Sequence, residues 1–251
     1  MNKKDPFKLE KLRQNLASKH KLSELKLLYD KSLPEISDLN TSNFWNERIQ
    51  KQIDYAPEDG MTRDRINIAY QYIPKTAKRI LDIGAGYGYI ERLMSKHKHI
   101  EIYGNDISKN AIKNLSKRYK GNFKLESVYK MNYQPNSFDT IFMLEILEHV
   151  PPSKTFKVLG DVKKILKKNG YLILSVPTNE GLEKMSDNPN GHVRMYMKDL
   201  IKAELEIAGF KILEIKTLYA FKNFYFIKNL ISKIFKNRWE PNDIVIKAEF
   251  I

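Results

Sequence analysis

The chain has 251 residues, of which 42% are hydrophobic, and this is enough for one α/β domain with a smaller appendage. It contains no cysteine, which excludes a disulfide framework, a thiolate metal site and a cysteine nucleophile. No apolar run approaches the roughly 18 residues that a membrane span needs, and the charged start lacks the apolar core of a secretory signal, so we expect a cytoplasmic protein. The net charge of +14 fits an anionic partner such as nucleic acid, lipid or an acidic substrate, but lysines spread over solvated helices would give the same excess.

The first 60 residues are expected to form a helical extension or lid. Residues 6–30 are charged, with irregularly spaced leucines that favour two short helices, and Ser32–Asn43 is typical of a linker. The segment Phe44–Ile49 is aromatic and would pack over the following domain or form part of a lid. Thr62 is a candidate N-cap for a helix that ends before Pro74.

From Ile80 onward, apolar strand patterns alternate with helical patterns, and this order favours a parallel sheet with helices on both faces. Seven strands are predicted, at residues 80–83, 100–106, 123–127, 138–143, 171–176, 211–217 and 243–250. Ser108 would cap a helix that runs through Tyr119, and Ser153 would cap another that stops at Gly170. A third helix is expected over residues 198–208, so residues 61–251 are predicted to form one α/β domain.

An insertion at residues 221–239 separates the last two strands. One face of its predicted helix is apolar, at positions Ile227, Leu230, Ile231, Ile234 and Phe235. No acidic residue occurs from Lys216 to Trp239, and the lysines lie off the apolar face. The pattern fits a lid or sheet-edge helix, a helix at a membrane surface, and an oligomer interface, and the sequence leaves these three open.

The loop after the first predicted strand is rich in glycine. The strand ends at Asp82-Ile83, and glycine then occupies positions 84, 86 and 88 before a helical stretch begins. Glycine permits positive φ and lets backbone amides approach a ligand. A helix N-terminus beyond the loop adds partial positive charge where a carboxylate or phosphate can bind. Such a loop alone is a weak signal, so its meaning depends on the motifs around it.

Two further motifs accompany this loop. Asp106 ends the second predicted strand, where a carboxylate can accept hydrogen bonds from both hydroxyls of a ribose. The fourth strand, 138–143, is followed by Leu144-Glu145-Ile146-Leu147-Glu148-His149-Val150-Pro151. With these motifs in this order, from about Thr62 to the C-terminus, the chain resembles the class I S-adenosylmethionine (SAM)-dependent methyltransferases. More narrowly, it is similar to the methyltransferase type 11 branch that contains the ubiquinone O-methyltransferases.

The resemblance implies SAM as the cofactor and a Rossmann-like seven-stranded sheet, mostly parallel, with the last strand antiparallel. The cofactor-binding residues that it implies are Asp82, Gly84, Ala85 and Gly86 at the methionine end, Asp106 at the ribose, Ile107, Ser127 and Val128 at the adenine, and Leu144. Family members often carry Asp where Ser127 stands, and a hydroxyl accepts from the adenine amine more weakly than a carboxylate. We therefore expect weaker cofactor affinity.

The base that would accept a proton from the methyl acceptor has several candidates. Glu145 and His149 follow the fourth strand, and His192 lies in the long loop after the fifth, at the same edge of the sheet. A histidine pKa of about 6.5 suits proton removal near neutral pH, which favours His149 and His192. With Glu145, these are the three predicted catalytic residues. The alternative is that Glu148 and His149 only cap and order the next helix.

A divalent metal site is a further alternative at the same place. Glu145, Glu148, His149 and His192 offer two carboxylates and two imidazoles, which can coordinate Mg²⁺, Mn²⁺ or a related ion. Such an ion would lower the pKa of a bound substrate hydroxyl. The sequence does not decide whether the protein uses a metal.

The expected function is SAM-dependent methylation of a hydroxyl on a small molecule, a lipid-linked compound or a glycan. Leu144–Leu147 stands where an Asn/Asp-Pro-Pro-Tyr/Phe string would have indicated methylation of amino groups. An RNA methyltransferase remains an alternative because of the charge, although no RNA-binding module is recognisable. An NAD-dependent Rossmann oxidoreductase is disfavoured by the glycine spacing and the seventh strand. A SAM-binding subunit without activity also stays open.

Overall fold

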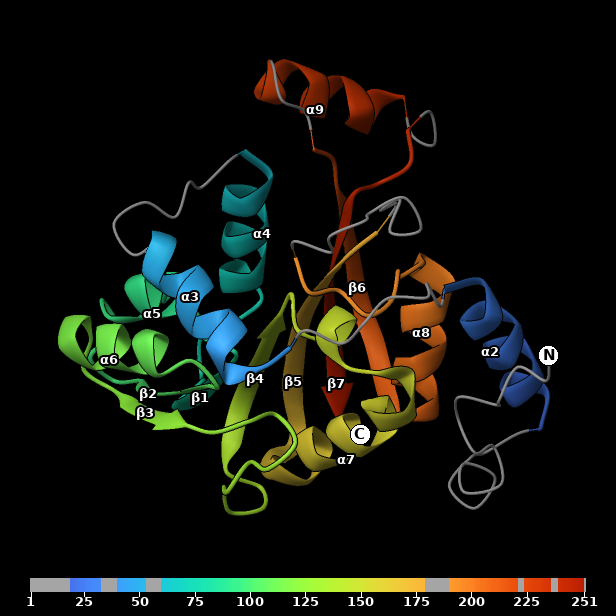
Figure 1. Cartoon of the computed structure of the whole chain (residues 1–251). Coiled ribbons are helices and arrows are strands. Elements are labelled where there is room, and N and C mark those ends of the chain that lie inside the picture. The colour runs from blue at the N-terminus through green and yellow to red at the C-terminus, as the bar shows by residue number, and fades with distance from the viewer. Residues whose placement is uncertain are drawn as a thin grey trace.

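A computed structural model of the chain describes residues 19–32, 40–52, 60–178, 190–220, 224–235 and 239–250. A single twisted sheet crosses the molecule, and helices lie on both of its faces (Figure 1). The strand order is β3-β2-β1-β4-β5-β7-β6. The strands are β1 (Arg79–Ile83), β2 (Glu101–Asp106), β3 (Asn122–Leu125), β4 (Phe138–Leu144), β5 (Leu166–Pro177), β6 (Phe210–Leu218) and β7 (Asp243–Phe250).

The sheet is parallel except for its seventh strand. β1 pairs in parallel with β2 on one side and with β4 on the other, so the carboxyl ends of these three strands lie at one edge. β7 runs antiparallel between β5 and β6. The predicted Rossmann-like sheet with an antiparallel last strand is therefore confirmed.

The described helices cover both faces of the sheet, and one of them lies beyond its end (Figure 1). They are α2 (Lys19–Ser32), α3 (Ser42–Gln52), α4 (Gly60–Gln71), α5 (Tyr89–Met94), α6 (Lys109–Arg118), the 3₁₀ helix η1 (Leu147–His149), α7 (Pro152–Ile165), α8 (Lys198–Ile207) and α9 (Tyr225–Ile234). Leu81 and Ile83 of β1 pack with α2, α7 and α8, whereas Ile80 packs with α4 and α5. Successive side chains of a strand point to opposite faces, so β1 is apolar on both.

Three predicted helix boundaries are wrong. Thr62 is not an N-cap, because α4 already begins at Gly60. Ser153 is not an N-cap either: α7 begins at Pro152, a residue whose fixed φ and missing amide suit the first helical turn. The helix does not continue to Gly170 but ends at Ile165, because Leu166 already pairs with Phe138 of β4.

The backbone at the start of β5 shows why the predicted helix does not reach Gly170. Asn169 has φ of 60°, a left-handed conformation that a continuous helix does not allow. A Cβ at Gly170 would lie 2.8 Å from the carbonyl oxygen of Lys167, so glycine serves this close backbone approach rather than a helix end. The predicted cap at Ser108 is confirmed, since its hydroxyl accepts from the Ala111 amide. The helix expected over residues 198–208 is also present as α8, and it is followed by Gly209 with φ of 85°.

The prediction for the N-terminal extension can be compared with the structure only in the described residues. Residues 1–18 and 33–39 lie outside the described part, so one of the two predicted short helices and most of the predicted linker fall there. The other helix, α2, is longer than expected, and Phe44–Ile49 is part of α3. Within the described residues, no helix is both long enough and apolar enough to cross a bilayer.

A buried ion pair anchors the loop between β5 and α8. The side chain of Arg194 is fully buried, and its guanidinium lies 2.7 Å from a carboxylate oxygen of Glu204 on α8. Arg194 also donates to the Thr155 hydroxyl at 3.0 Å, and the hydroxyls of Tyr29 and Tyr196 complete the network around Glu204. Because a buried charge is costly unless it is paired, this network fixes the path of residues 190–197.

We predict that Arg194→Met lowers the free energy of unfolding by about 3–5 kcal/mol, because Glu204 is left buried without a cation. The double variant Arg194→Met, Glu204→Gln should lose less than Arg194→Met alone. Urea unfolding of the variants measures both losses. Lys157→Met, which breaks an exposed pair with Asp161, is the control and should cost less than about 1 kcal/mol. Equal losses for Arg194→Met and the control would contradict the anchoring role.

Candidate functional site

A cavity of about 700 Å³ lies at the carboxyl edge of β1, β2 and β4. Every residue predicted to bind the cofactor lines it: Asp82, Gly84, Ala85, Gly86, Asp106, Ile107, Ser127, Val128 and Leu144. The three predicted catalytic residues, Glu145, His149 and His192, line it as well. The parallel sheet therefore brings together residues that are more than a hundred positions apart in the sequence.

The glycine loop forms one wall of this cavity. Its glycines at positions 84, 86 and 88 all have positive φ, of 71°, 49° and 77°. The amides of Gly84 and Ala85 donate to the carbonyl of Asn105 at 2.8 and 3.1 Å, which ties the loop to the end of β2. A Cβ at Gly86 would meet no atom closer than 3.7 Å, so the backbone of Gly86 is open toward the cavity. A side chain here would fill space that a ligand can use.

Two carboxylates lie beside the loop. Asp106 at the end of β2 accepts the amide of Gly86 at 3.0 Å and the amide of Ser108 at 2.7 Å. Burial, together with the nearby Asp106, raises the pKa of Asp82 to about 7. Burial also raises the pKa of Asp106, although its backbone hydrogen bonds oppose the rise. This end of the cavity therefore favours a ligand that carries positive charge.

Sequence reasoning missed two buried polar side chains near these carboxylates. Glu91 of α5 is fully buried, and within the described residues neither of its carboxylate oxygens has a hydrogen-bond partner. Its pKa is raised well above the usual value by burial and by Asp82. Asn105 lines the cavity, and its side-chain amide likewise has no partner among the described residues. Neither stands in a sequence pattern that marks it as buried, because α5 also contains Arg92 and β2 also contains Glu101 and Asp106.

The opposite side of this half of the cavity is formed by the residues that follow β2 and β3. β3 ends at Leu125, two residues earlier than predicted, so Ser127 lies in a turn. The Ser127 hydroxyl accepts the amide of Tyr129 at 3.2 Å. Glu126, which the sequence did not single out, also lines the cavity.

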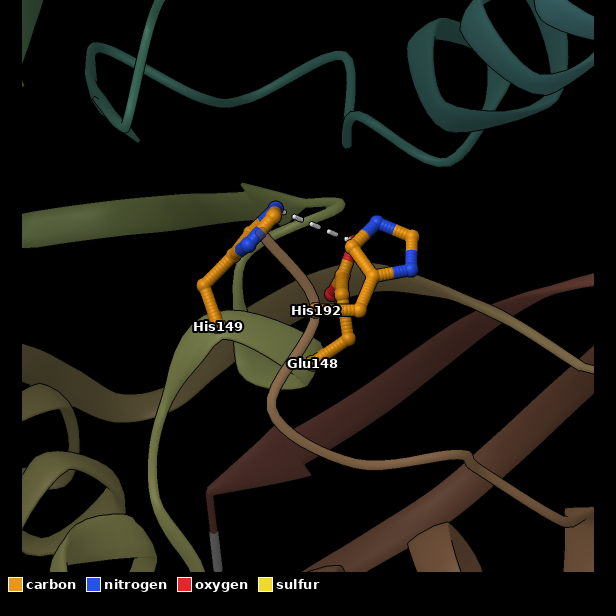
Figure 2. A group of neighbouring side chains, drawn as sticks. All are labelled: Glu148, His149 and His192. Carbon is orange, nitrogen blue, oxygen red and sulfur yellow. Dashed lines mark ion pairs between the residues drawn. The ribbon is translucent and has the colours of Figure 1, made fainter. Parts of the chain in front are cut away.

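Glu148, His149 and His192 form a cluster in the other half of the cavity. The side chains of Glu148 and His149 come from η1, and His192 comes from the loop anchored by Arg194 (Figure 2). One nitrogen or oxygen from each residue lies within 4.8 Å of the others. The imidazole rings have centroids 4.9 Å apart, and His149 Nε2 is 3.7 Å from Glu148 Oε1. A carboxylate and two imidazoles can serve as a proton acceptor or as ligands of a divalent metal.

Hydrogen bonding fixes the orientation of His149. Its Nδ1 lies 3.0 Å from the carbonyl oxygen of Gly191. A carbonyl can only accept, so Nδ1 carries the proton and the neutral ring has its lone pair on Nε2. That nitrogen is on the side of Glu148. The ring of Trp45 packs edge-on against His149, with centroids 4.9 Å apart.

Glu145 lies outside this cluster, contrary to the predicted four-residue metal site. Its backbone is left-handed, with φ of 57°, and its carboxylate has other partners. Glu145 accepts from the Ser175 hydroxyl at 2.7 Å and pairs with Arg65 at 2.9 Å. Arg65 in turn pairs with buried Asp243 at 2.7 Å. The geometry thus gives Glu145 a role in linking β4 to α4 rather than in the cluster.

Helix α3 lies over the cavity. Trp45, Arg48 and Ile49 of α3 line it. Arg48 donates to the Asn190 side chain at 2.9 Å, and on the other side the Asn46 amide oxygen accepts from Ser108 at 3.0 Å. These contacts connect α3 to the His192 loop and to the start of α6. The sequence indicated an aromatic segment here but not the residues that it would contact.

Comparisons with known proteins agree with the geometry. A family model described as a methyltransferase domain matches residues 45–215, which is more than half of the chain. A 27-O-demethylrifamycin SV methyltransferase of Amycolatopsis mediterranei is 27% identical over 167 residues, which cover 61% of each chain. A sterol 24-C-methyltransferase of Kluyveromyces lactis is 28% identical over 166 residues, 59% of this chain and 44% of the relative. The chain thus matches between 44% and 61% of the length of these two relatives.

A solved structure shares the fold. A SAM-dependent methyltransferase from Archaeoglobus fulgidus has a TM-score of 0.60 at 22% identity, covering 81% of this chain and 98% of that one. The family match and the antiparallel seventh strand overturn the alternative of an NAD-dependent oxidoreductase. The chain belongs to the class I SAM-dependent methyltransferases.

Proposed function

We propose that the chain methylates a hydroxyl oxygen of a small-molecule or lipid-linked acceptor. The observation that carries this proposal is that a single cavity has two chemically different halves. One half has the glycine loop and two buried carboxylates, and the other has the cluster of Glu148, His149 and His192. A cofactor and an acceptor can therefore lie next to each other, away from bulk water.

The first half fits SAM. When bound, SAM supplies a methyl group on a cationic sulfur that leaves as a neutral thioether. The ionised carboxylates of Asp82 and Asp106 would offset its positive charge, and the open backbone at Gly86 leaves room for close approach. Each oxygen of Asp106 accepts one amide and retains a lone pair that can accept a ribose hydroxyl. In this proposal Ile107, Ser127 and Val128 would contact the adenine, and Leu144 would supply an apolar part of the wall of the cofactor site.

The second half fits an acceptor hydroxyl. The Nε2 lone pair of His149 is held in place by the Gly191 carbonyl on the other side of the ring, and it can take the hydroxyl proton. Glu148 would stabilise the imidazolium that forms, because its carboxylate is only 3.7 Å away. His192 would orient the acceptor. The same three side chains could instead hold a divalent metal that lowers the hydroxyl pKa.

The N-terminal extension completes the site in this proposal. Trp45 packs on His149, and Arg48 holds Asn190, so α3 would exclude water from both halves once the ligands are bound. The 60-residue extension would thus act as a cover for the methyltransferase domain of residues 61–251. Its aromatic side chains would contact an apolar part of the acceptor.

We predict that affinity for S-adenosylhomocysteine falls about tenfold from pH 8 to pH 6. The amino group of the ligand is cationic and favours ionised Asp82, whose pKa of about 7 means that it becomes protonated over this range. Binding should therefore strengthen as the pH rises through 7. Calorimetric titration at both pH values measures the change. Asp82→Asn should bind more weakly with no such slope, and an equal slope in this variant would assign the titration to another group.

Methyl transfer itself can be tested with radiolabelled SAM and a panel of phenols, sugars, isoprenoid alcohols, matched amines and RNA. We expect label in a hydroxyl compound, and a fall in kcat of about 10²–10⁴-fold in His149→Ala with S-adenosylhomocysteine affinity unchanged. His99→Ala, at an exposed histidine outside the cavity, is the control. A chelator separates the two roles, since only a metal-assisted enzyme should lose activity. Transfer only to amines or RNA, or full activity in His149→Ala, would overturn the proposal.

A further inference from the structure

The outward face of α9 is apolar and exposed. Seven large hydrophobic side chains on or beside this helix have exposed fractions of 37–75%: Phe224, Phe226, Ile227, Leu230, Ile231, Ile234 and Phe235. At 100° per residue, these positions spread over roughly one half of the helix circumference. Figure 1 shows α9 at the end of the molecule, past the ends of β6 and β7 and away from the sheet. A contiguous apolar surface of this kind marks a site of interaction.

The face of α9 toward the protein is polar instead. The Tyr225 hydroxyl and the Asn229 amide both donate to the same carboxylate oxygen of Asp64 on α4, at 2.8 and 3.0 Å. Ser232 is buried on this side and donates to the Asn229 carbonyl at 2.8 Å. A helix that packs on a core normally turns its apolar face inward. In α9 this arrangement is reversed, and the described part of the chain leaves its apolar face exposed.

The helix lies beside the cavity without forming part of its wall. Ala220 before α9 and Asn242 after it both line the cavity, as does Met61 of α4. Among the described residues that line the cavity, none belongs to α9. Of the three roles that the sequence left open for this insertion, a lid over the cavity is therefore not the one that the packing favours.

We propose that α9 docks the protein on an anionic lipid surface. The helix has ten residues and is about 15 Å long, so it would lie in the interface rather than cross the bilayer. The sequence from Lys216 to Trp239 contains six basic residues and no acidic one, and the exposed Lys228 lies at the margin of the apolar face. Apolar side chains next to lysines complement a surface of acyl chains beneath negatively charged headgroups.

A second copy of the chain fits this face less well. In a dimer through α9, two basic stretches without acidic residues would face each other, and each molecule carries a net charge of +14. The like charges would repel. A stable dimer also needs about 800 Å² from each partner, which exceeds what one face of a 15 Å helix supplies. Lipid docking does not depend on the proposed acceptor, but it would place the mouth of the cavity near the membrane.

Flotation of the full chain with vesicles tests this proposal. We expect flotation with vesicles that contain phosphatidylglycerol, weakening as salt is raised, and much less with pure phosphatidylcholine. Leu230→Glu should lower the partition coefficient about tenfold or more, because burial of one leucine contributes about a factor of ten. Leu27→Glu on α2 is the matched control, since Leu27 is 57% exposed and Leu230 is 61% exposed.

Several results would overturn lipid docking. These are absence of flotation with anionic vesicles, equal flotation with neutral vesicles, and equal loss in the two glutamate variants. Self-association in sedimentation experiments without lipid, abolished by Leu230→Glu, would assign the face to a second copy if flotation is absent. Affinity for S-adenosylhomocysteine should be the same in Leu230→Glu, so the failure of docking and the failure of the proposed methyl transfer are separate results.

Discussion

The parallel pairing of β1 with β2 and β4 is the constraint on which the rest of the site depends. Asp82 is aligned with Gly104 on one side and Phe142 on the other, so the three strands end at the same level. The glycine loop follows β1, Asp106 is the last residue of β2, and η1 begins shortly after β4. A shift in register would move the buried carboxylates and the Glu148–His149 pair apart by several ångströms. The cavity is therefore a property of the sheet edge rather than of any one loop.

A second, independent anchor brings His192 into the site. β5 supplies the loop that carries this residue, and the buried pair of Arg194 and Glu204 fixes the returning part of it against α8. The Gly191 carbonyl then sets the tautomer of His149, while the Val193 amide donates to the Glu148 carbonyl at 2.9 Å. A buried network behind the cavity wall thus determines the geometry of the cluster. The backbone from Gly191 to Arg194 thus links the ion pair in the core to the cluster in the cavity.

Much of the fold was predictable because strand periodicity and glycine positions are local signals. The existence of β7, the loop at Gly84 and the carboxylate at Asp106 follow from short stretches of sequence, whereas the antiparallel direction of β7 was implied by the family resemblance. The stop of α7 at Ile165 was not predictable, since it depends on the pairing of Leu166 with Phe138, which is distant in sequence. The partners of Glu145 and the burial of Glu91 were missed for the same reason. Which side of α9 faces the protein is likewise set by Asp64 on another helix.

The central claim is that the buried carboxylates and the glycine loop form a SAM site. Calorimetric titration with S-adenosylhomocysteine tests it most directly, with NADH as the rival ligand and Asp106→Ala as the disabling variant. The account predicts tight binding of S-adenosylhomocysteine, none of NADH, and a large loss in Asp106→Ala but not in Asp161→Ala, whose carboxylate lies on the outer surface of α7. Equal binding by the two variants, or a preference for NADH, would contradict it.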